Sequence, residues 1–196
     1  MLDPLAVARS ELILGGQKSG KSRRAELLAL AWLNRSPAHR AVLIATAQPW
    51  DEEMSERIAR HQADRALRVP NMHTVEEPLR LAQALVRHSQ PQTLVVVDCL
   101  TLWLTNWLMP ASTNEQNKPS APDACAQPAM ILGALKDAPG PVVLVGNEIG
   151  LGVIPLGRET RAFVDALGRL NQQMAQGCER VTFMAAGLPL TLKGQP

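Results

Sequence analysis

The sequence predicts a single α/β domain with a mostly parallel β-sheet and helices on both faces. A chain of 196 residues suits one domain. Short apolar runs alternate along it with longer segments of helical character, which is the pattern of a parallel sheet covered on both sides. The first apolar run leads into a glycine-rich loop at residues 15–22. We therefore expect one nucleotide-binding domain over residues 1–196, of the kind built around a phosphate-binding loop (P-loop).

The expected strands are short runs of aliphatic residues without helical periodicity. The segments between them lack internal breaks and have the length and composition of helices; the one at 21–34, for example, has no Gly or Pro and is rich in Ala and Leu. The strands are expected at 12–14, 41–45, 94–97, 142–145 and 181–185, and the helices at 21–34, 51–65, 79–88, 100–108, 129–137 and 159–176.

Two stretches are predicted to be irregular. Residues 67–73 contain Pro70 and Asn71 and read as a short connection. Residues 110–128 are rich in Pro, Ser, Asn, Gln and Ala, with almost no large apolar side chains. Because such a composition cannot bury a core, we predict a flexible surface loop over residues 110–128.

The loop at residues 15–22 has the form Gly-x4-Gly-Lys-Ser. Its glycines permit backbone angles that let successive N–H groups converge on one anion. Lys21 supplies a charge for the outer phosphates, and the Ser22 hydroxyl can bind Mg²⁺. The following helix would direct its positive end at the phosphates. The predicted nucleotide contacts in this loop are Gly15, Gly16, Gln17, Lys18, Ser19, Gly20, Lys21 and Ser22.

A second feature is the apolar run 94–97, which ends in Asp98. In a P-loop fold, such a carboxylate lies across from the phosphates and holds Mg²⁺ directly or through water. Many buried strands also end in Asp for capping reasons, so the pattern depends on the P-loop before it. We predict Ser22 and Asp98 as metal ligands, and polar groups of Thr101, Thr105 and Asn106 in the same cleft.

The helix expected at 51–65 opens with acidic residues and closes with basic ones, which suits the helix dipole. A spacing of four places Arg57, His61 and Arg65 along one stripe. A histidine between two cations suits an anion site, and its ring nitrogen could attack phosphorus. The alternative is a solvated histidine on a charged helix.

A third cluster, residues 146–155, follows a strand and is rich in glycine. It should lie at the carboxyl edge of the sheet, where ligands bind in open α/β folds. The helix after it carries polar side chains, including Arg161, Asp165 and Asn171. A ligand-binding loop and a plain turn before a surface helix both remain open here.

Composition excludes several classes of function. A net charge of +2 with scattered arginines gives no argument for nucleic acid or for an anionic membrane surface. Three cysteines without a C-x-x-C pair argue against a zinc site and suggest a reducing compartment. The most apolar span, residues 94–109, is too short to cross a bilayer, and the start of the chain does not read as a signal peptide. We expect a cytoplasmic protein.

Taken in order, these pieces resemble the bifunctional adenosylcobinamide kinase / adenosylcobinamide-phosphate guanylyltransferase family of cobalamin biosynthesis. The resemblance runs from about Leu12 to the Gly187-Leu188-Pro189-Leu190 segment. The motifs that carry it are Gly15–Ser22, Arg57-Ile58-x-x-His61-x-x-x-Arg65, Thr74-Val75-Glu76-Glu77-Pro78, Val97-Asp98-Cys99-Leu100-Thr101-x-Trp103-x-Thr105-Asn106, Asn147-Glu148-x-Gly150-x-Gly152-x-x-Pro155, Arg161-x-Phe163 and Gly168-x-x-Asn171-Gln172.

The resemblance implies two reactions: phosphorylation of the aminopropanol hydroxyl of adenosylcobinamide, then transfer of GMP from GTP onto that phosphate. It implies that His61 carries the GMP covalently and that Lys21 acts with it in catalysis. It also implies Mg²⁺ as cofactor, GTP and ATP as substrates, and a homo-oligomer, with a trimer as the suggested state. Beyond the loop, the nucleotide-binding residues that it implies are Ala47, Gln48, Pro49, Arg57, Gln62, Ala63, Asp64, Arg65, Glu76 and Asp98.

The chain departs from the family pattern in three places: residues 65–74 lack the usual Arg-Pro-x-x-Trp-x-Thr sequence, Val164 replaces a common arginine, and residues 110–128 form a longer stretch. None of these departures touches Lys21, Asp98 or His61. Two alternatives stay open. One is a guanylyltransferase that has lost the kinase step, and the other is a GTP-binding regulatory switch without a covalent intermediate.

Overall fold

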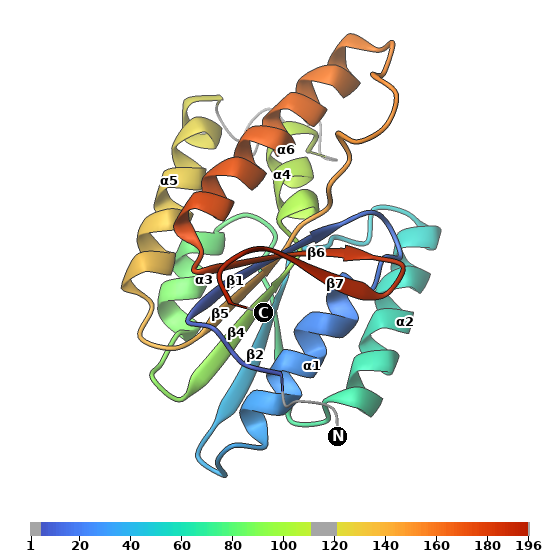
Figure 1. Cartoon of the computed structure of the whole chain (residues 1–196). Helices are drawn as coiled ribbons and strands as arrows, with labels where there is room; N and C mark the ends of the chain where they lie inside the picture. The colour runs from blue at the N-terminus through green and yellow to red at the C-terminus, as the bar shows by residue number, and fades with distance from the viewer. Residues whose placement is uncertain (1–4, 111–120, 196) are drawn as a thin grey trace.

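The computed structural model describes residues 5–110 and 121–195 and has one seven-stranded sheet of order β3-β2-β4-β5-β1-β6-β7 (Figure 1). All neighbouring strands pair in parallel except β6 and β7, which form an antiparallel pair at one edge. The predicted mostly parallel α/β fold is therefore confirmed. The strands are β1 Ser10–Gly15, β2 Arg40–Ala45, β3 Met72–Glu76, β4 Thr93–Asp98, β5 Val142–Val145, β6 Arg180–Ala185 and β7 Leu188–Lys193.

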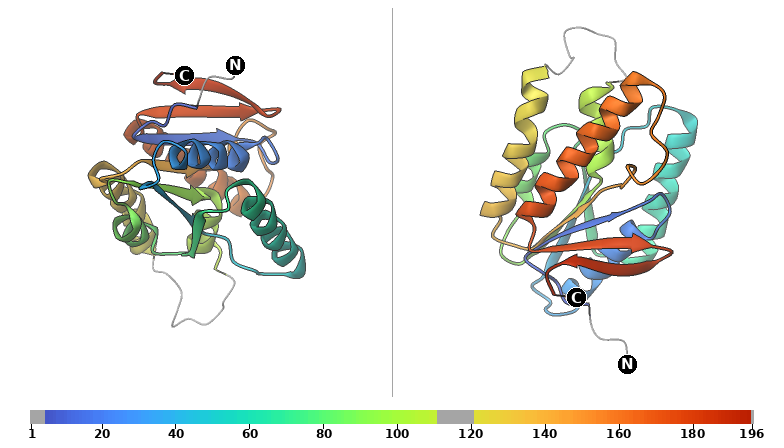
Figure 2. Two further views of the ribbon diagram at one scale, coloured as in Figure 1. Left: turned by 90° about the horizontal axis from the view of Figure 1, so that it is seen from below. Right: turned by 45° about the horizontal axis from the view of Figure 1, so that its top comes forward.

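Helices cover both faces of the sheet, as the continuous apolar character of its central strands requires (Figure 2). Buried side chains of α3, α4, α5 and α6 pack on one face, against Leu12, Val95 and Leu144 among others. Those of α1 pack on the other face, against Ile13, Val96 and their neighbours. The helices are α1 Lys21–Leu33, α2 Glu52–Arg68, α3 Leu81–His88, α4 Leu100–Leu108, α5 Ala121–Asp137 and α6 Arg158–Gly177.

The prediction of an irregular connection over residues 67–73 is wrong at both ends. Helix α2 continues to Arg68, and β3 begins at Met72 and pairs in parallel with β2 along the edge of the sheet. As an edge strand, β3 has one neighbour and buries few side chains, so its sequence lacks the continuous apolar run of the central strands. Its backbone pairing with β2 keeps it in the sheet although few of its side chains are buried.

The predicted flexible loop over residues 110–128 is wrong for its last part. Helix α5 begins at Ala121 and includes Pro128. Several alanines favour the helix, and Pro122 falls in its first turn, where the backbone N–H has no helical partner. Residues 111–120 of the predicted loop lie outside the described residues.

A tight turn joins β6 to β7 beside the P-loop. Its two central residues, Ala186 and Gly187, have φ angles of 51° and 80°, as the favoured two-residue hairpin turn requires. The Gly187 amide donates a hydrogen bond of 3.0 Å to the carbonyl of Ser19. The turn of this hairpin therefore contacts the P-loop directly and supports its backbone.

Candidate nucleotide-binding site

The P-loop joins β1 to α1 and has the unusual backbone that its glycines predict. Gly15 and Gly20 have φ angles of 152° and 101°, and Lys18 has 56°. A Cβ atom at Gly15 would lie 2.4 Å from the carbonyl oxygen of Met184 on β6, so this position admits no side chain. Gln17 and Lys18 are exposed at the tip of the loop, whereas Ser19 is buried and its hydroxyl has no partner within the described residues.

The Lys21 side chain is folded back into the loop. It is 8% exposed, and its ammonium group donates a 2.6 Å hydrogen bond to the carbonyl of Gly16. Burial lowers the pKa of Lys21, the nearby Cys99 and Asp98 side chains raise it, and the positive charge of Arg57 lowers it. An anion bound in the loop would offset the desolvation that this ammonium group experiences. The Lys21 ammonium group therefore experiences the charges of both Asp98 and Arg57.

The segment that carries Asp98 is held by a buried network. Thr46, which follows β2 and is fully buried, donates its amide to the Asp98 carbonyl at 3.1 Å. Its hydroxyl donates to the Cys99 carbonyl at 2.7 Å and accepts from the Cys99 amide at 2.9 Å. The side-chain amide of Asn106 on α4 donates to the carbonyls of Thr46 and Pro78 at 2.8 and 3.0 Å. The backbone at Asp98 and Cys99 is therefore held by Thr46, which is held in turn by Asn106.

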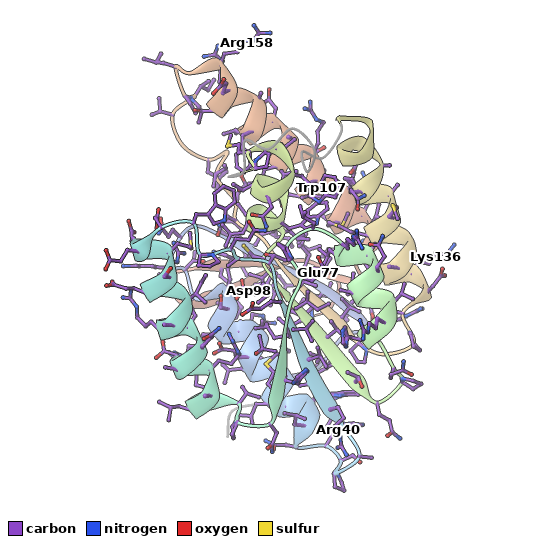
Figure 3. The ribbon with its side chains drawn as sticks, turned by 180° about the vertical axis from the view of Figure 1, so that it is seen from behind. Arg40, Glu77, Asp98, Trp107, Lys136 and Arg158 are labelled. Atoms are coloured by element: carbon purple, nitrogen blue, oxygen red, sulfur yellow. The ribbon has the colours of Figure 1, made fainter. Side chains whose placement is uncertain are left out.

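The donor set fits Mg²⁺ held together with nucleotide phosphates. Asp98 is the last residue of β4 and lies at the carboxyl ends of the parallel strands, next to the start of α4 (Figure 3). Ser22 lies in the first turn of α1. Across residues 5–110 and 121–195, no three or more His, Cys, Asp or Glu side chains gather into a metal site. A hydroxyl and one carboxylate match the way Mg²⁺ is usually bound, since substrate phosphates and water complete its coordination. The two residues thus remain the predicted ligands.

Strand β5 lies between β1 and β4 in the sheet, so the chain that leaves it passes between the P-loop and Asp98. Three hydrogen bonds fix this chain. The Asn147 amide donates to the Thr101 hydroxyl at 2.8 Å, the Asn171 side chain donates to the Asn147 carbonyl at 3.0 Å, and the Glu148 amide donates to the Gly15 carbonyl at 3.0 Å. The start of the glycine-rich segment therefore lies against the P-loop and α4, a placement that the sequence left open.

Helix α2 presents Arg57 and His61 to solvent. Its first turn is capped by Asp51, whose carboxylate accepts a 2.7 Å hydrogen bond from the Met54 amide. Arg65, expected on the same stripe, is instead 9% exposed and donates to the Thr74 hydroxyl of β3 at 3.2 Å. The C-terminal part of α2 is thus attached to the body of the protein, while the part around His61 remains accessible.

The remaining predicted residues lie around these elements. Ala47, Gln48 and Pro49 form the connection from Thr46 to α2, partly or fully exposed, and Glu76 ends β3. Within α2, Gln62 and Ala63 are exposed. Asp64 forms an ion pair of 3.2 Å with Arg68, one turn further on, which also pairs with Glu26 at 2.6 Å.

Thr46 is a site residue that the sequence analysis missed. A single threonine after an apolar run has no distinctive pattern, and its contacts to Asp98 and Cys99 depend on the pairing of β2 with β4. In the sheet, Ala45 is level with Asp98, and Thr46 follows one residue beyond that level.

The fold and this site together define a P-loop nucleotide-binding protein. Two solved structures have a similar fold. One is the flagellar accessory protein FlaH from Methanocaldococcus jannaschii (TM-score 0.52, 10% identity, covering 97% of this chain and 80% of that one). The other is a protein from Pyrococcus horikoshii OT3 (TM-score 0.52, 10% identity, covering 98% and 90%). At these identities the likeness concerns the fold alone.

Sequence comparison identifies the family. The family model described as cobinamide kinase / cobinamide phosphate guanyltransferase matches residues 11–192. The chain is 47% identical to the bifunctional adenosylcobalamin biosynthesis protein CobP of Pseudomonas aeruginosa, over 95% of this chain and 98% of that protein. It is 33% identical to the bifunctional adenosylcobalamin biosynthesis protein CobU of Escherichia coli, over 93% and 98%. The chain belongs to the cobinamide kinase / cobinamide phosphate guanyltransferase family, and the predicted resemblance is confirmed.

Proposed function

We propose that this protein phosphorylates adenosylcobinamide and then transfers GMP from GTP to adenosylcobinamide phosphate through a GMP–His61 intermediate, giving adenosyl-GDP-cobinamide. The observation that carries the proposal is the arrangement around the P-loop. The buried Lys21 experiences the charges of the strand-end Asp98 and of Arg57 on α2, and α2 leaves His61 accessible one turn beyond Arg57. Membership of the family supplies the two activities.

In the kinase step, the P-loop binds the triphosphate of ATP or GTP through its amides and through Lys21. Ser22 and Asp98 would hold Mg²⁺, which neutralises phosphate charge when bound. The substrate hydroxyl oxygen attacks the γ-phosphorus, the bond to the β,γ-bridging oxygen breaks, and a nucleoside diphosphate leaves. The chain contributes position and charge, because transfer to a hydroxyl needs no protein nucleophile.

In the guanylyl transfer, a ring nitrogen of His61 attacks the α-phosphorus of GTP, and pyrophosphate leaves with the electron pair of the broken P–O bond. A phosphate oxygen of adenosylcobinamide phosphate then attacks the same phosphorus, and the P–N bond breaks to release the histidine. Arg57 would neutralise charge that develops on the phosphates. Arg65 does so less directly, because its side chain is engaged with Thr74.

The protein would act as a homo-oligomer, with a trimer as the suggested state, and in the cytoplasm, where nucleoside triphosphates are available. Within the described residues, Cys99 and Cys178 are buried free thiols, which fits a reducing compartment. In the described part of the chain, none of the helices has the length and apolar character needed to span a membrane.

The proposal is tested by following each product with mass spectrometry. Purified protein with Mg²⁺, ATP and adenosylcobinamide should give adenosylcobinamide phosphate, and further addition of GTP should give adenosyl-GDP-cobinamide and pyrophosphate. Conversion of only the phosphorylated substrate would instead identify a guanylyltransferase without the kinase step. GTP hydrolysis without any change in either corrinoid would favour the regulatory switch.

A further inference from the structure

We propose that Glu148 is the catalytic base of the kinase step and accepts the proton of the substrate hydroxyl as that oxygen attacks the γ-phosphorus. This inference rests on the proposed function. The O–H bond of the alcohol breaks, a new P–O bond forms, and the bond to the departing nucleoside diphosphate breaks. The proton moves to the Glu148 carboxylate and is later released to water.

The first support is the place of β5 in the sheet. Val145, its last residue, is level with Ile13 of β1 on one side and with Asp98 of β4 on the other. The chain beyond Val145 therefore emerges between the loop that binds phosphate and the carboxylate that would hold the metal. A reacting γ-phosphoryl group has to lie in this interval, because both groups act on it.

The second support is the direct attachment of Glu148 to the P-loop. Its amide donates to the carbonyl of Gly15 at 3.0 Å, while the Lys21 ammonium donates to the carbonyl of Gly16 at 2.6 Å. The backbone of Glu148 and the ammonium group of Lys21 thus bond to successive peptide groups of one loop. The hydrogen bonds from Asn147 to Thr101 and from Asn171 to Asn147 hold the same segment from α4 and α6.

The third support is that the other carboxylates near this edge have different roles. Glu77 accepts hydrogen bonds from the amides of Leu79 and Arg80, at 3.0 and 2.8 Å, ahead of α3. Glu76 ends the edge strand β3, four positions from β1 in the strand order, and Asp98 is assigned to the metal. One oxygen of Glu148 accepts a 2.7 Å hydrogen bond from the Gly150 amide. Its second oxygen has no partner within the described residues and stays available for a proton.

The chain beyond Glu148 is suited to a bulky acceptor. Five large apolar side chains between residues 149 and 156 are exposed, from 42% at one end to 97% at the other. An alcohol carried on a large, partly apolar molecule could rest on this segment with its hydroxyl directed toward Glu148. The exposed residues are Ile149, Leu151, Val153, Ile154 and Leu156.

The test separates the two half-reactions in one variant. In Glu148→Gln the amide oxygen can still accept from Gly150, so the loop is preserved while the base is lost. Its rate of adenosylcobinamide phosphorylation should fall by about 100-fold or more, the range typical of a removed general base. Its rate of covalent GMP formation from GTP, measured without corrinoid, should stay within about threefold of wild type, since that step uses His61.

The matched control is Glu159→Gln, an exposed carboxylate in the first turn of α6, which should leave both rates unchanged. Phosphorylation within threefold of wild type in Glu148→Gln would overturn the proposal. So would an equal loss of both half-reactions with a lowered melting temperature, because that pattern indicates a structural role. A wild-type protein that phosphorylates no corrinoid would refute the proposed function itself, which keeps the two failures distinct.

Discussion

A substitution at Gly15 tests the geometry of the P-loop most sharply. In Gly15→Ala, the new Cβ would lie 2.4 Å from the backbone oxygen of Met184 and 2.6 Å from the Ser19 hydroxyl oxygen, at a φ angle of 152°. Backbone strain of this kind costs about 1–3 kcal/mol, and overpacking against a strand costs about 1–3 kcal/mol more. We expect a loss of about 2–6 kcal/mol in the free energy of unfolding.

The neighbouring glycine provides the control. A Cβ at Gly16 would meet no atom within 4 Å, and its φ angle is not positive, so Gly16→Ala should change stability by less than about 0.5 kcal/mol. For a domain of this size, each kcal/mol shifts the melting temperature by about 2–4 °C. Calorimetry of the nucleotide-free protein should therefore show a drop of roughly 5–20 °C for Gly15→Ala and almost none for Gly16→Ala. Equal melting temperatures for the two variants would refute the P-loop geometry.

Two further substitutions test the site, and one chemical modification tests the burial of two cysteines. Lys21→Ala should weaken GTP binding by about tenfold or more, because a charge-assisted contact is lost, while the fold is kept; titration calorimetry with unchanged GTP affinity would contradict this role. Asp98→Asn should remove the part of GTP affinity and turnover that depends on Mg²⁺ and preserve binding in EDTA; a defect of equal size in EDTA would indicate a structural role. Burial raises the pKa of Cys99 to about 11 and that of Cys178 to about 12, so both thiols stay protonated at about pH 8. In a Cys125→Ser background, a thiol reagent should therefore react with them at least about 100 times more slowly in native protein than in urea, and rapid native labelling would show that one of them is accessible.

The central sheet and the P-loop could be predicted because their signals are local. Continuous aliphatic runs mark strands that are buried on both faces, and the spacing of Gly15, Gly20 and Lys21 marks a loop whose function depends on backbone conformation. Edge strands carry a weaker signal. Strand β3 has one neighbour, and β7 alternates exposed leucines with other residues, so neither shows the pattern of the central strands.

The contacts that assemble the site are not local, which is why the sequence left several of them open. Thr46 and Cys99 are 53 residues apart, and they meet because β2 and β4 pair in register. Glu148 reaches Gly15 because β5 is inserted between β1 and β4, an order that strand prediction alone does not provide. The contact of Arg65 is also non-local: helical spacing places Arg65 on the same stripe as His61, whereas its hydrogen bond to Thr74 depends on how α2 lies beside β3.

The proposed guanylyl transfer requires covalent GMP at His61. Protein incubated with GTP labelled in the α-phosphate, in the presence of Mg²⁺, should retain the label after denaturation, and the adduct should be labile to acid and stable to base, as expected for a phosphorus–nitrogen bond. Tryptic mapping should place it at His61, and His61→Asn should lose it while still binding GTP through the P-loop. Label retained in the His61→Asn protein, or GTP hydrolysis by the wild type without any adduct, would contradict the proposed mechanism.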